Sequence, residues 1–142
     1  MRYLSHNEIF HQGETLRQTY AEMLKKRDEI VSFIRAYDPG DILFVACGSS
    51  YWMSLSAALS VQRETGVRCA AIKSSDLLFD PECYRSAFRR PLIIALTRSG
   101  RTEETLRACG MLREWYGAKM LCFVEYTEQT PIADAADVSV LL

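Results

Sequence analysis

Five short apolar runs occupy the chain after residue 40, and each is long enough for one buried β-strand. Continuous apolar runs that alternate with segments of helical periodicity are typical of a parallel sheet covered by helices on both faces. We therefore expect an α/β fold, a three-layer αβα sandwich around a five-stranded parallel sheet. The predicted strands are residues 42–47, 67–73, 92–97, 119–125 and 138–142, and the predicted helices are residues 51–65, 103–116 and 131–135.

A helical segment precedes the first strand. Residues 5–8 have the residue types of a capping box at the start of a short helix, and Gly13 is expected to separate it from a longer one. A Pro-Gly turn at residues 38–41 ends the longer helix. We predict an N-terminal helical leader, residues 1–37, packed on a single domain of residues 38–142. The apolar stripe of the longer helix consists of Leu16, Tyr20, Met23, Leu24, Ile30, Val31 and Ile34.

Two segments between strands carry more specific expectations. The helix after the first strand repeats Leu55, Ala58, Leu59 and Gln62 at helical spacing, so this mostly apolar face is expected to lie on the sheet. Residues 74–90, after the second strand, show no clear period and are predicted to be irregular.

Two turns rich in hydroxyl side chains each follow a predicted strand and open a helix. One is residues 48–50, Gly-Ser-Ser, and the other is residues 97–102, Thr-Arg-Ser-Gly-Arg-Thr. The start of a helix offers unpaired N–H groups and the positive end of the helix dipole, which together favour a phosphate. Ligands of open parallel sheets bind beyond the carboxyl ends of the strands where the strand order reverses. If the first and third strands are neighbours there, both turns line one crevice.

The same residue types also serve a purely structural purpose. Thr102 has the residue type of a helix cap, with Glu103 and Glu104 complementing the dipole of the helix that follows. One such turn does not separate capping from anion binding, but two of the same kind favour an anion site. If capping were the whole role, replacing Ser99 and Thr102 would cost about 0.5–2 kcal/mol each and would remove no ligand binding.

Composition and charge exclude several classes of protein. A chain of 142 residues suits one domain, and a formal net charge of -1 gives no basic excess for nucleic acid or an anionic membrane surface. No apolar run approaches the roughly 20 residues that a membrane helix needs. Because residues 1–8 lack the apolar core of a signal peptide, we expect a cytoplasmic protein.

The cysteines and histidines do not indicate a metal site. Five cysteines contain no C-x-x-C pair, which fits free thiols in a reducing compartment. Cys47 borders the predicted crevice, where it is either a small apolar side chain or a reactive thiol. His6 and His11 lack the spacing of the common zinc pair.

Four segments resemble those of the sugar isomerase (SIS) domain family. Residues 47–51, C-G-S-S-Y, resemble its C-G-T-S-Y turn, and residues 97–102, T-R-S-G-R-T, resemble its S-Q-S-G-E-T turn. Residues 130–137 resemble the S-P-L-A…A-D approach to its last strand. Residues 8–12, E-I-F-H-Q, resemble the E-I-x-x-Q leader of the glucosamine-6-phosphate synthase group. The resemblance covers nearly the whole chain and implies a flavodoxin-like sheet that binds a phosphorylated sugar.

The resemblance also implies roles for particular residues. Thr97, Ser99 and Thr102 would hold the phosphate together with the backbone after Arg98. The turn after the first strand, Gly48, Ser49 and Ser50, would contact the phosphate or nearby sugar hydroxyls.

Two residues depart from the synthase pattern. Arg98 replaces a Gln and is similar to the S-R-S-G turn of the ketose/aldose isomerase and amino-sugar-phosphate deaminase branch. It either binds the phosphate or points outward as a solvated residue. Glu125 follows the fourth strand where an Asn is common, and it is either a general base or a carboxylate that is solvated or paired with a neighbour.

The activity implied is that of a hexose or amino-hexose 6-phosphate isomerase or deaminase. Proton transfer between C1 and C2 needs a base near neutral pH but no metal or redox cofactor. In this family the catalytic Glu, His and Lys follow the first SIS domain, and no motif of this chain replaces them, so no catalytic residue is assigned. The alternative is a non-catalytic phosphosugar sensor. Tyr51, Trp52 and Met53 begin a helix beside the crevice, where they either pack in the core or contact a partner, which we expect to be a second copy in a homodimer or a second SIS domain.

Overall fold

The computed structural model describes residues 4–125 and 129–142. Every strand and helix predicted after residue 40 is present there, with its ends at most two residues from the prediction. The elements are α1 (Leu4–Tyr37), β1 (Asp41–Ala46), α2 (Ser49–Thr65), β2 (Arg68–Lys73), α3 (Ser74–Phe79), the 3-10 helix η1 (Pro81–Cys83), β3 (Pro91–Thr97), α4 (Glu103–Tyr116), β4 (Lys119–Val124), α5 (Pro131–Ala135) and β5 (Val138–Leu141).

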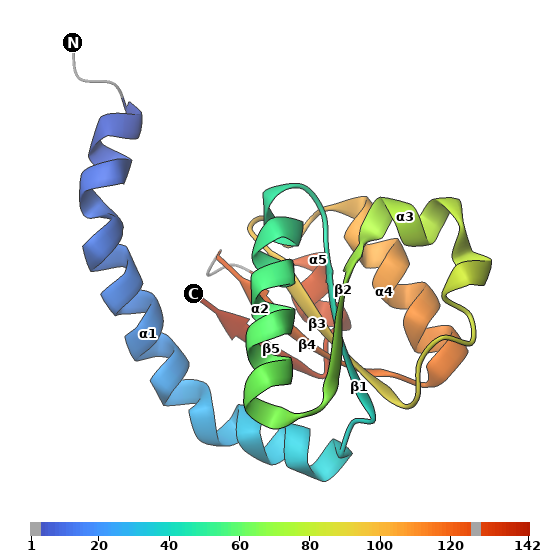
Figure 1. The fold of residues 1–142 in the computed structure, drawn as a ribbon. Coiled ribbons are helices and arrows are strands. Elements are labelled where there is room, and N and C mark those ends of the chain that lie inside the picture. The colour runs from blue at the N-terminus through green and yellow to red at the C-terminus, as the bar shows by residue number, and fades with distance from the viewer. Residues whose placement is uncertain (1–3, 126–128) are drawn as a thin grey trace.

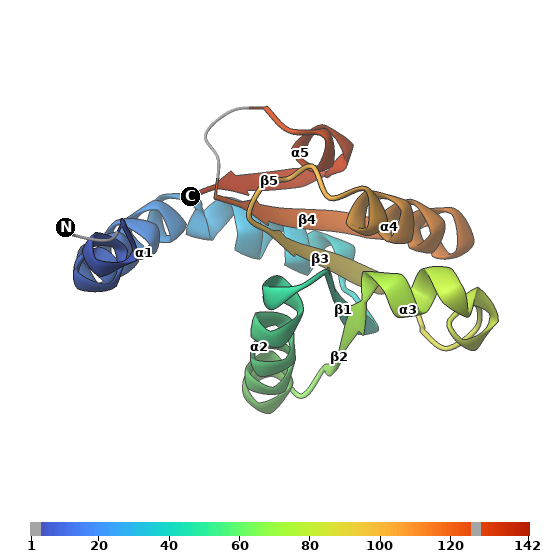
Figure 2. The ribbon, with the colours of Figure 1, turned by 90° about the horizontal axis from the view of Figure 1, so that it is seen from above.

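The strands form one parallel sheet in the order β2-β1-β3-β4-β5. Helices α3, α4 and α5 cover one face, and α2 with the end of α1 covers the other (Figures 1 and 2). The predicted three-layer αβα sandwich is therefore confirmed, and the strand order is that of flavodoxin-like sheets. The order reverses between β1 and β3, so these two strands are neighbours at the reversal.

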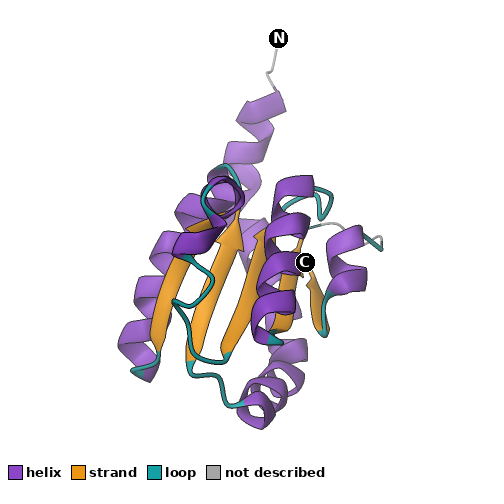
Figure 3. Ribbon diagram, turned by 90° about the vertical axis from the view of Figure 1, so that its right-hand side faces the viewer, coloured by secondary structure: helices purple, strands orange, loops and turns teal. Residues whose placement is uncertain are grey.

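The central strands are buried on both faces, which explains their continuous apolar runs. In β1, Leu43 and Val45 belong to the core under α3, α4 and α5, whereas Ile42 and Phe44 belong to the core under α1 and α2. This alternation between two cores follows from the two-residue period of a strand. Figure 3 shows the strands side by side with their arrowheads at one edge of the sheet.

Helix α1 is a single helix, so the predicted break at Gly13 is wrong. A glycine inside a helix costs only about 1 kcal/mol relative to alanine, and the flanking residues are good helix formers. The end of α1 packs on the sheet through Phe33, Ile34 and Tyr37, and the Tyr37 hydroxyl donates to the carbonyl of Pro91 (3.1 Å). The first half of the helix extends away from the sheet (Figure 1), and Leu16, Tyr20 and Leu24 of the predicted stripe are exposed.

Two further expectations are corrected by the structure. Residues 74–90 are not wholly irregular, because they contain α3 and η1, and Leu77 of α3 is fully buried in the core. In α2 the buried residues are Ser54 and Ala58, whereas Leu59 is 71% exposed. Ser54 tolerates burial because its hydroxyl donates to the carbonyl of Ser50 (2.8 Å).

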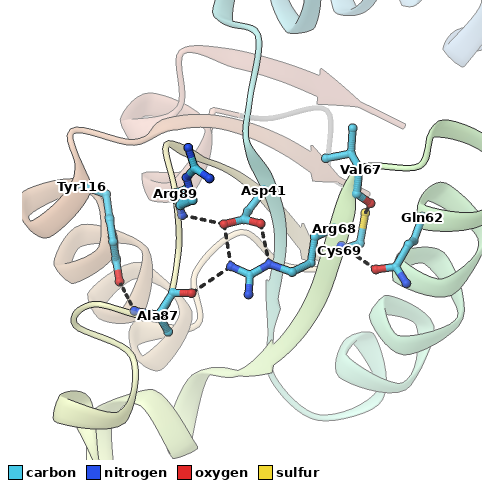
Figure 4. A network of polar contacts seen from close by, with 8 residues as sticks. All are labelled: Asp41, Gln62, Val67, Arg68, Cys69, Ala87, Arg89 and Tyr116. Atoms are coloured by element: carbon cyan, nitrogen blue, oxygen red, sulfur yellow. Dashed lines mark hydrogen bonds and ion pairs between the residues drawn. The ribbon is translucent and has the colours of Figure 1, made fainter.

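A buried carboxylate ties together the amino ends of the strands (Figure 4). Asp41, 3% exposed at the start of β1, accepts from Arg68 Nε (2.6 Å) and Nη2 (2.7 Å) at the start of β2. It also accepts from the backbone N–H of Arg89, and Arg68 donates onward to the carbonyl of Ala87 (2.8 Å). The Arg68 guanidinium holds the pKa of Asp41 below its ordinary value. This network joins β1, β2 and the segment before β3.

Candidate functional site

The two hydroxyl-rich turns lie at the carboxyl ends of the neighbouring strands β1 and β3. They line one cavity of about 260 Å³, at the point where the strand order reverses. All residues that the sequence analysis predicts for the phosphate and sugar site line this one cavity. The cavity is lined by Cys47, Gly48, Ser49, Ser50, Leu96, Thr97, Arg98, Ser99, Thr102 and Thr105.

The turn between β1 and α2 depends on glycine. Gly48 has φ 58° and ψ -134°, a backbone conformation that an L-residue adopts only with strain. It occupies the N-cap position of α2, and a glycine has no side chain with which to cap the N–H groups of the first turn. The N–H of Tyr51 donates to the Gly48 carbonyl (3.2 Å), so among the described residues of this turn the N–H groups of Ser49 and Ser50 are left for solvent or a ligand. Ser49 is exposed and Ser50 is half-buried at the cavity wall.

The turn between β3 and α4 is held by its own hydroxyl groups. Thr97 Oγ1 accepts from the N–H of Gly100 (3.1 Å), and Ser99 Oγ accepts from the N–H of Arg101 (3.2 Å). Each hydroxyl still has its proton to donate into the cavity. The turn's shape is thus fixed by the same oxygens that line the cavity.

Helix α5 supports this turn from outside. Gly100 has φ 64°, and its carbonyl accepts from the N–H of Ile132 (3.2 Å). A Cβ at Gly100 would lie 2.6 Å from the Cβ of Thr130, which leaves no room for a side chain. Thr130 in turn accepts from the N–H of Ala133 and caps α5. The turn therefore packs directly on the start of α5.

Thr102 stands at the N-cap position of α4, but its hydroxyl makes no capping hydrogen bond. Its backbone carbonyl accepts from the N–H groups of Thr105 and Leu106, both at 3.1 Å. The geometry therefore does not support the alternative that Thr102 serves only as a cap. Its half-buried side chain lines the cavity at the positive end of the α4 dipole.

Sequence reasoning did not single out the buried hydroxyl pair beside the cavity, Ser74 and Thr105. Ser74 Oγ donates to the carbonyl of Ala46 (3.0 Å) and lies 3.2 Å from Thr105 Oγ1. Thr105 lines the cavity, so the pair connects the end of β1 with the starts of α3 and α4. The only signal in the sequence was a threonine one turn after Thr102, which is also common on an ordinary helix face.

Arg98 and Glu125, the two departures from the synthase pattern, meet each other. Arg98 Nε lies 3.0 Å from Glu125 Oε2, and the two side chains are 74% and 60% exposed. Arg98 also lines the cavity between the turns. Glu125 lines a second cavity, of about 660 Å³, together with Arg98 and the start of α1. Glu125 was expected to be either a general base or a carboxylate that is solvated or paired with a neighbour. In the structure it is paired with Arg98.

The thiols differ in accessibility. Cys47 is half-buried and lines the smaller cavity. Burial raises the pKa of Cys109 to about 12 and that of Cys122 to about 11, so both remain protonated at neutral pH.

Within residues 4–125 and 129–142, no group of three His, Cys, Asp or Glu side chains is placed to hold a metal ion. The helices described there include none with the length and apolar character of a membrane span.

No family model and no curated protein matches this sequence. Solved structures, however, match the fold closely. The tagatose-6-phosphate ketose/aldose isomerase of Escherichia coli superposes with a TM-score of 0.85 at 20% identity, covering 96% of this chain and 39% of the isomerase. The chain thus spans about two fifths of that protein.

Two other neighbours have the same fold. The C-terminal domain of glucosamine-fructose-6-phosphate aminotransferase from Francisella tularensis has a TM-score of 0.77 at 18% identity, covering 99% of this chain and 39% of that one. The sugar isomerase domain of an RpiR transcription factor from Sphaerobacter thermophilus has a TM-score of 0.72 at 17% identity. The match covers 99% of this chain and 75% of that one. The chain therefore has the fold of the sugar isomerase domain, as the resemblance of its turns implies.

Proposed function

We propose that this chain binds a phosphorylated sugar, with the phosphate in the cavity between the β1–α2 and β3–α4 turns. The observation that carries the proposal is the convergence of both turns on one cavity at the reversal of strand order. Thr97, Ser99 and Thr102 would donate from their hydroxyls, and the first N–H groups of α2 and α4 would add backbone donors.

Arg98 would complete the phosphate site from its rim. A guanidinium gives charge-assisted, two-pronged hydrogen bonds to phosphate oxygens. Its present partner, Glu125, is exposed, and exposed ion pairs contribute only about 0–1 kcal/mol, so Arg98 exchanges partners at low cost. Gly48, Ser49 and Ser50 would contact the phosphate or the sugar hydroxyls beside it.

The substrate class we propose is a hexose or amino-hexose 6-phosphate, and the activity is that of an aldose/ketose isomerase or an amino-sugar-phosphate deaminase. The fold of the E. coli tagatose-6-phosphate isomerase supports the first activity. Because the chain spans 39% of that protein, we assign it the binding part of such an enzyme and no catalytic residue. Free thiols fit our proposal of a cytoplasmic protein, and exposed apolar side chains on α1 and α2 fit a dimer.

The alternative function is that of a phosphosugar sensor. Its support is the likeness to the sugar isomerase domain of an RpiR transcription factor, which extends over 99% of this chain. The two functions share the binding site and differ in turnover. Incubation with fructose 6-phosphate or glucosamine 6-phosphate, followed by assays for the isomeric sugar and for ammonia, separates them. Binding with neither product favours the sensor.

Thermal unfolding tests the binding site. A ligand that binds only the folded chain stabilises it by about 2.7 kcal/mol at a hundredfold excess over its Kd. We expect this gain with glucose 6-phosphate, fructose 6-phosphate or glucosamine 6-phosphate, and none with the unphosphorylated sugars. The double variant Ser99→Ala/Thr102→Ala should lose it.

The matched control is Ser60→Ala, which removes a hydroxyl from an exposed position of α2 outside the cavity lining. This variant should keep the full gain in stability. If the thermal unfolding midpoint of the wild-type chain does not change at millimolar concentrations of any of the three phosphosugars, the proposed site is rejected.

A further inference from the structure

A second cavity, of about 660 Å³, shares a wall with the proposed phosphate site. Arg98 lines both cavities, whereas Glu125 lines only the larger one. The smaller cavity, about 260 Å³, is closed on two sides by its turns. A phosphate ester bound there would extend its carbon chain out past the rim, and Arg98 lies at the side on which the larger cavity begins.

The opposite wall of the larger cavity is one face of α1. Glu8, His11 and Gln12 line it, followed by Thr15 and Leu16. Positions 8, 11, 12 and 15 are spaced by three, four and seven residues, which places them on one side of the helix. Thus the first half of α1, which contributes no described residue to either core, presents a polar face to the carboxyl ends of β3 and β4.

The side chains on this face suit a polyhydroxylated ligand. Carboxylates accept from hydroxyl groups, and carboxamides both donate and accept. Within residues 4–125 and 129–142, Glu8 and Gln12 make no side-chain hydrogen bond, so both have their full capacity for a ligand. Across the cavity, Glu125 adds a third polar group, held at the border by Arg98.

We propose that the larger cavity binds the carbon chain of the phosphorylated sugar, and that Glu8 and Gln12 of α1 determine specificity together with Glu125. This role depends on the proposed function, because the phosphate site is what places the chain beside α1. When Arg98 turns to the phosphate, the Glu125 carboxylate becomes available to a sugar hydroxyl. Helix α1 is then a wall of the binding site as well as a leader.

The test compares two probes on the full chain by titration calorimetry: fructose 6-phosphate, which reaches both cavities, and inorganic phosphate, which occupies only the smaller one. Loss of one hydrogen bond to the sugar should weaken binding of fructose 6-phosphate about two- to tenfold in Gln12→Ala. The double variant Glu8→Ala/Gln12→Ala should lose more. The affinity for inorganic phosphate should not change.

Gln18→Ala is the matched control, because Gln18 is an exposed glutamine of the same helix outside the cavity lining. It should bind both probes as the wild type does. Circular dichroism of each variant checks that α1 still forms. Unchanged binding of fructose 6-phosphate in the double variant would overturn the role of α1, and so would an equal loss for both probes. If wild-type chain binds neither probe, the proposed function fails first.

Discussion

Arg98 and Glu125 form an ion pair between the ends of β3 and β4, with 3.0 Å between Nε and Oε2. The pairing follows from the register of the two strands. Thr97 is opposite Val124 in the parallel ladder, so the residues that follow them emerge side by side. Among the described residues that line the proposed phosphate cavity, Arg98 is the one cation, and it is held by a carboxylate at the end of the neighbouring strand.

Replacing this carboxylate should release Arg98 without destabilising the fold. Both side chains are more than half exposed, so Glu125→Gln should change the free energy of unfolding by no more than about 1 kcal/mol. Affinity for inorganic phosphate should rise, by at most about fivefold, because Arg98 loses a competing anion. Calorimetric titration measures this.

Glu82→Gln is the control for this effect, since Glu82 forms a similar exposed pair with Arg85 outside the cavity (3.0 Å). It should leave phosphate binding unchanged. Weaker phosphate binding in Glu125→Gln would mean that the pair positions Arg98 for the anion rather than competing with it.

A methyl group at Gly100 should disrupt both stability and binding. Gly100→Ala combines a positive φ of 64° with a contact of 2.6 Å to Thr130 Cβ, so we expect a loss of about 2–4 kcal/mol and of phosphosugar binding. Gly117→Ala has a similar φ, 60°, but no atom within 4 Å of the added Cβ. It should cost about 1–2 kcal/mol and leave binding intact. Urea unfolding and ligand titration of both variants check this, and equal effects on binding would contradict the proposed role of the turn.

Stability should fall in acid because two paired carboxylates have lowered pKa values. Arg68 lowers the pKa of Asp41 below 3.8. Burial raises the pKa of Asp137, but hydrogen bonds from Lys119 and the N–H of Met120, together with the charge of Arg113, have the larger combined effect. The pKa of Asp137 is therefore below 3.8. A lowered pKa contributes stability that is complete above the unfolded value and is lost as pH falls through the folded value.

The contribution of Asp41 and Asp137 to the free energy of unfolding should therefore be constant above about pH 5. It should decrease as the pH falls below about 4. Asp41→Asn should be less stable at neutral pH and should show a shallower decline in acid. Unfolding curves at closely spaced pH values, from strongly acidic to neutral, provide the measurement. Parallel declines for wild type and variant would show that Asp41 does not contribute.

Thiol labelling should distinguish the cysteines by their surroundings. With a maleimide at neutral pH, exposed Cys83 should react in the folded chain, whereas Cys109 and Cys122 should react only after unfolding. Cys47 lines the phosphate cavity, so its labelling should slow when fructose 6-phosphate is bound. Mass spectrometry of digested, labelled protein reports each site. Protection of Cys83 by the same ligand, to the same degree as Cys47, would point to a global effect.

Much of the fold is predictable from the sequence because strands buried on both faces have continuous apolar runs. The errors occur where the rest of a helix outweighed one local signal. Gly13 costs too little to end a helix whose other residues favour it. Leu59 matches a helical period, yet α2 buries Ser54 instead, and the Ser54 hydroxyl is satisfied there by the Ser50 carbonyl.

Most residues that line the cavity were predictable from the sequence, whereas their contacts were not. Two turns with hydroxyl groups after buried strands were enough to nominate the residues that line one cavity. The pairing of Arg98 with Glu125 depends on the register of β3 and β4, which no local pattern contains. The approach of α1 to the same edge depends on the path of a helix whose first half lies outside both described cores, and residue types alone do not predict such a path.

The Asp41–Arg68 network has a consequence for how this chain tolerates change. It joins strands at their amino ends, whereas the phosphate cavity opens at the carboxyl ends. Side chains such as Ser99, Gln12 and Glu125 take no part in the hydrogen bonds of this network. Changes to side chains that line the cavity therefore leave the Asp41–Arg68 network at the opposite edge intact.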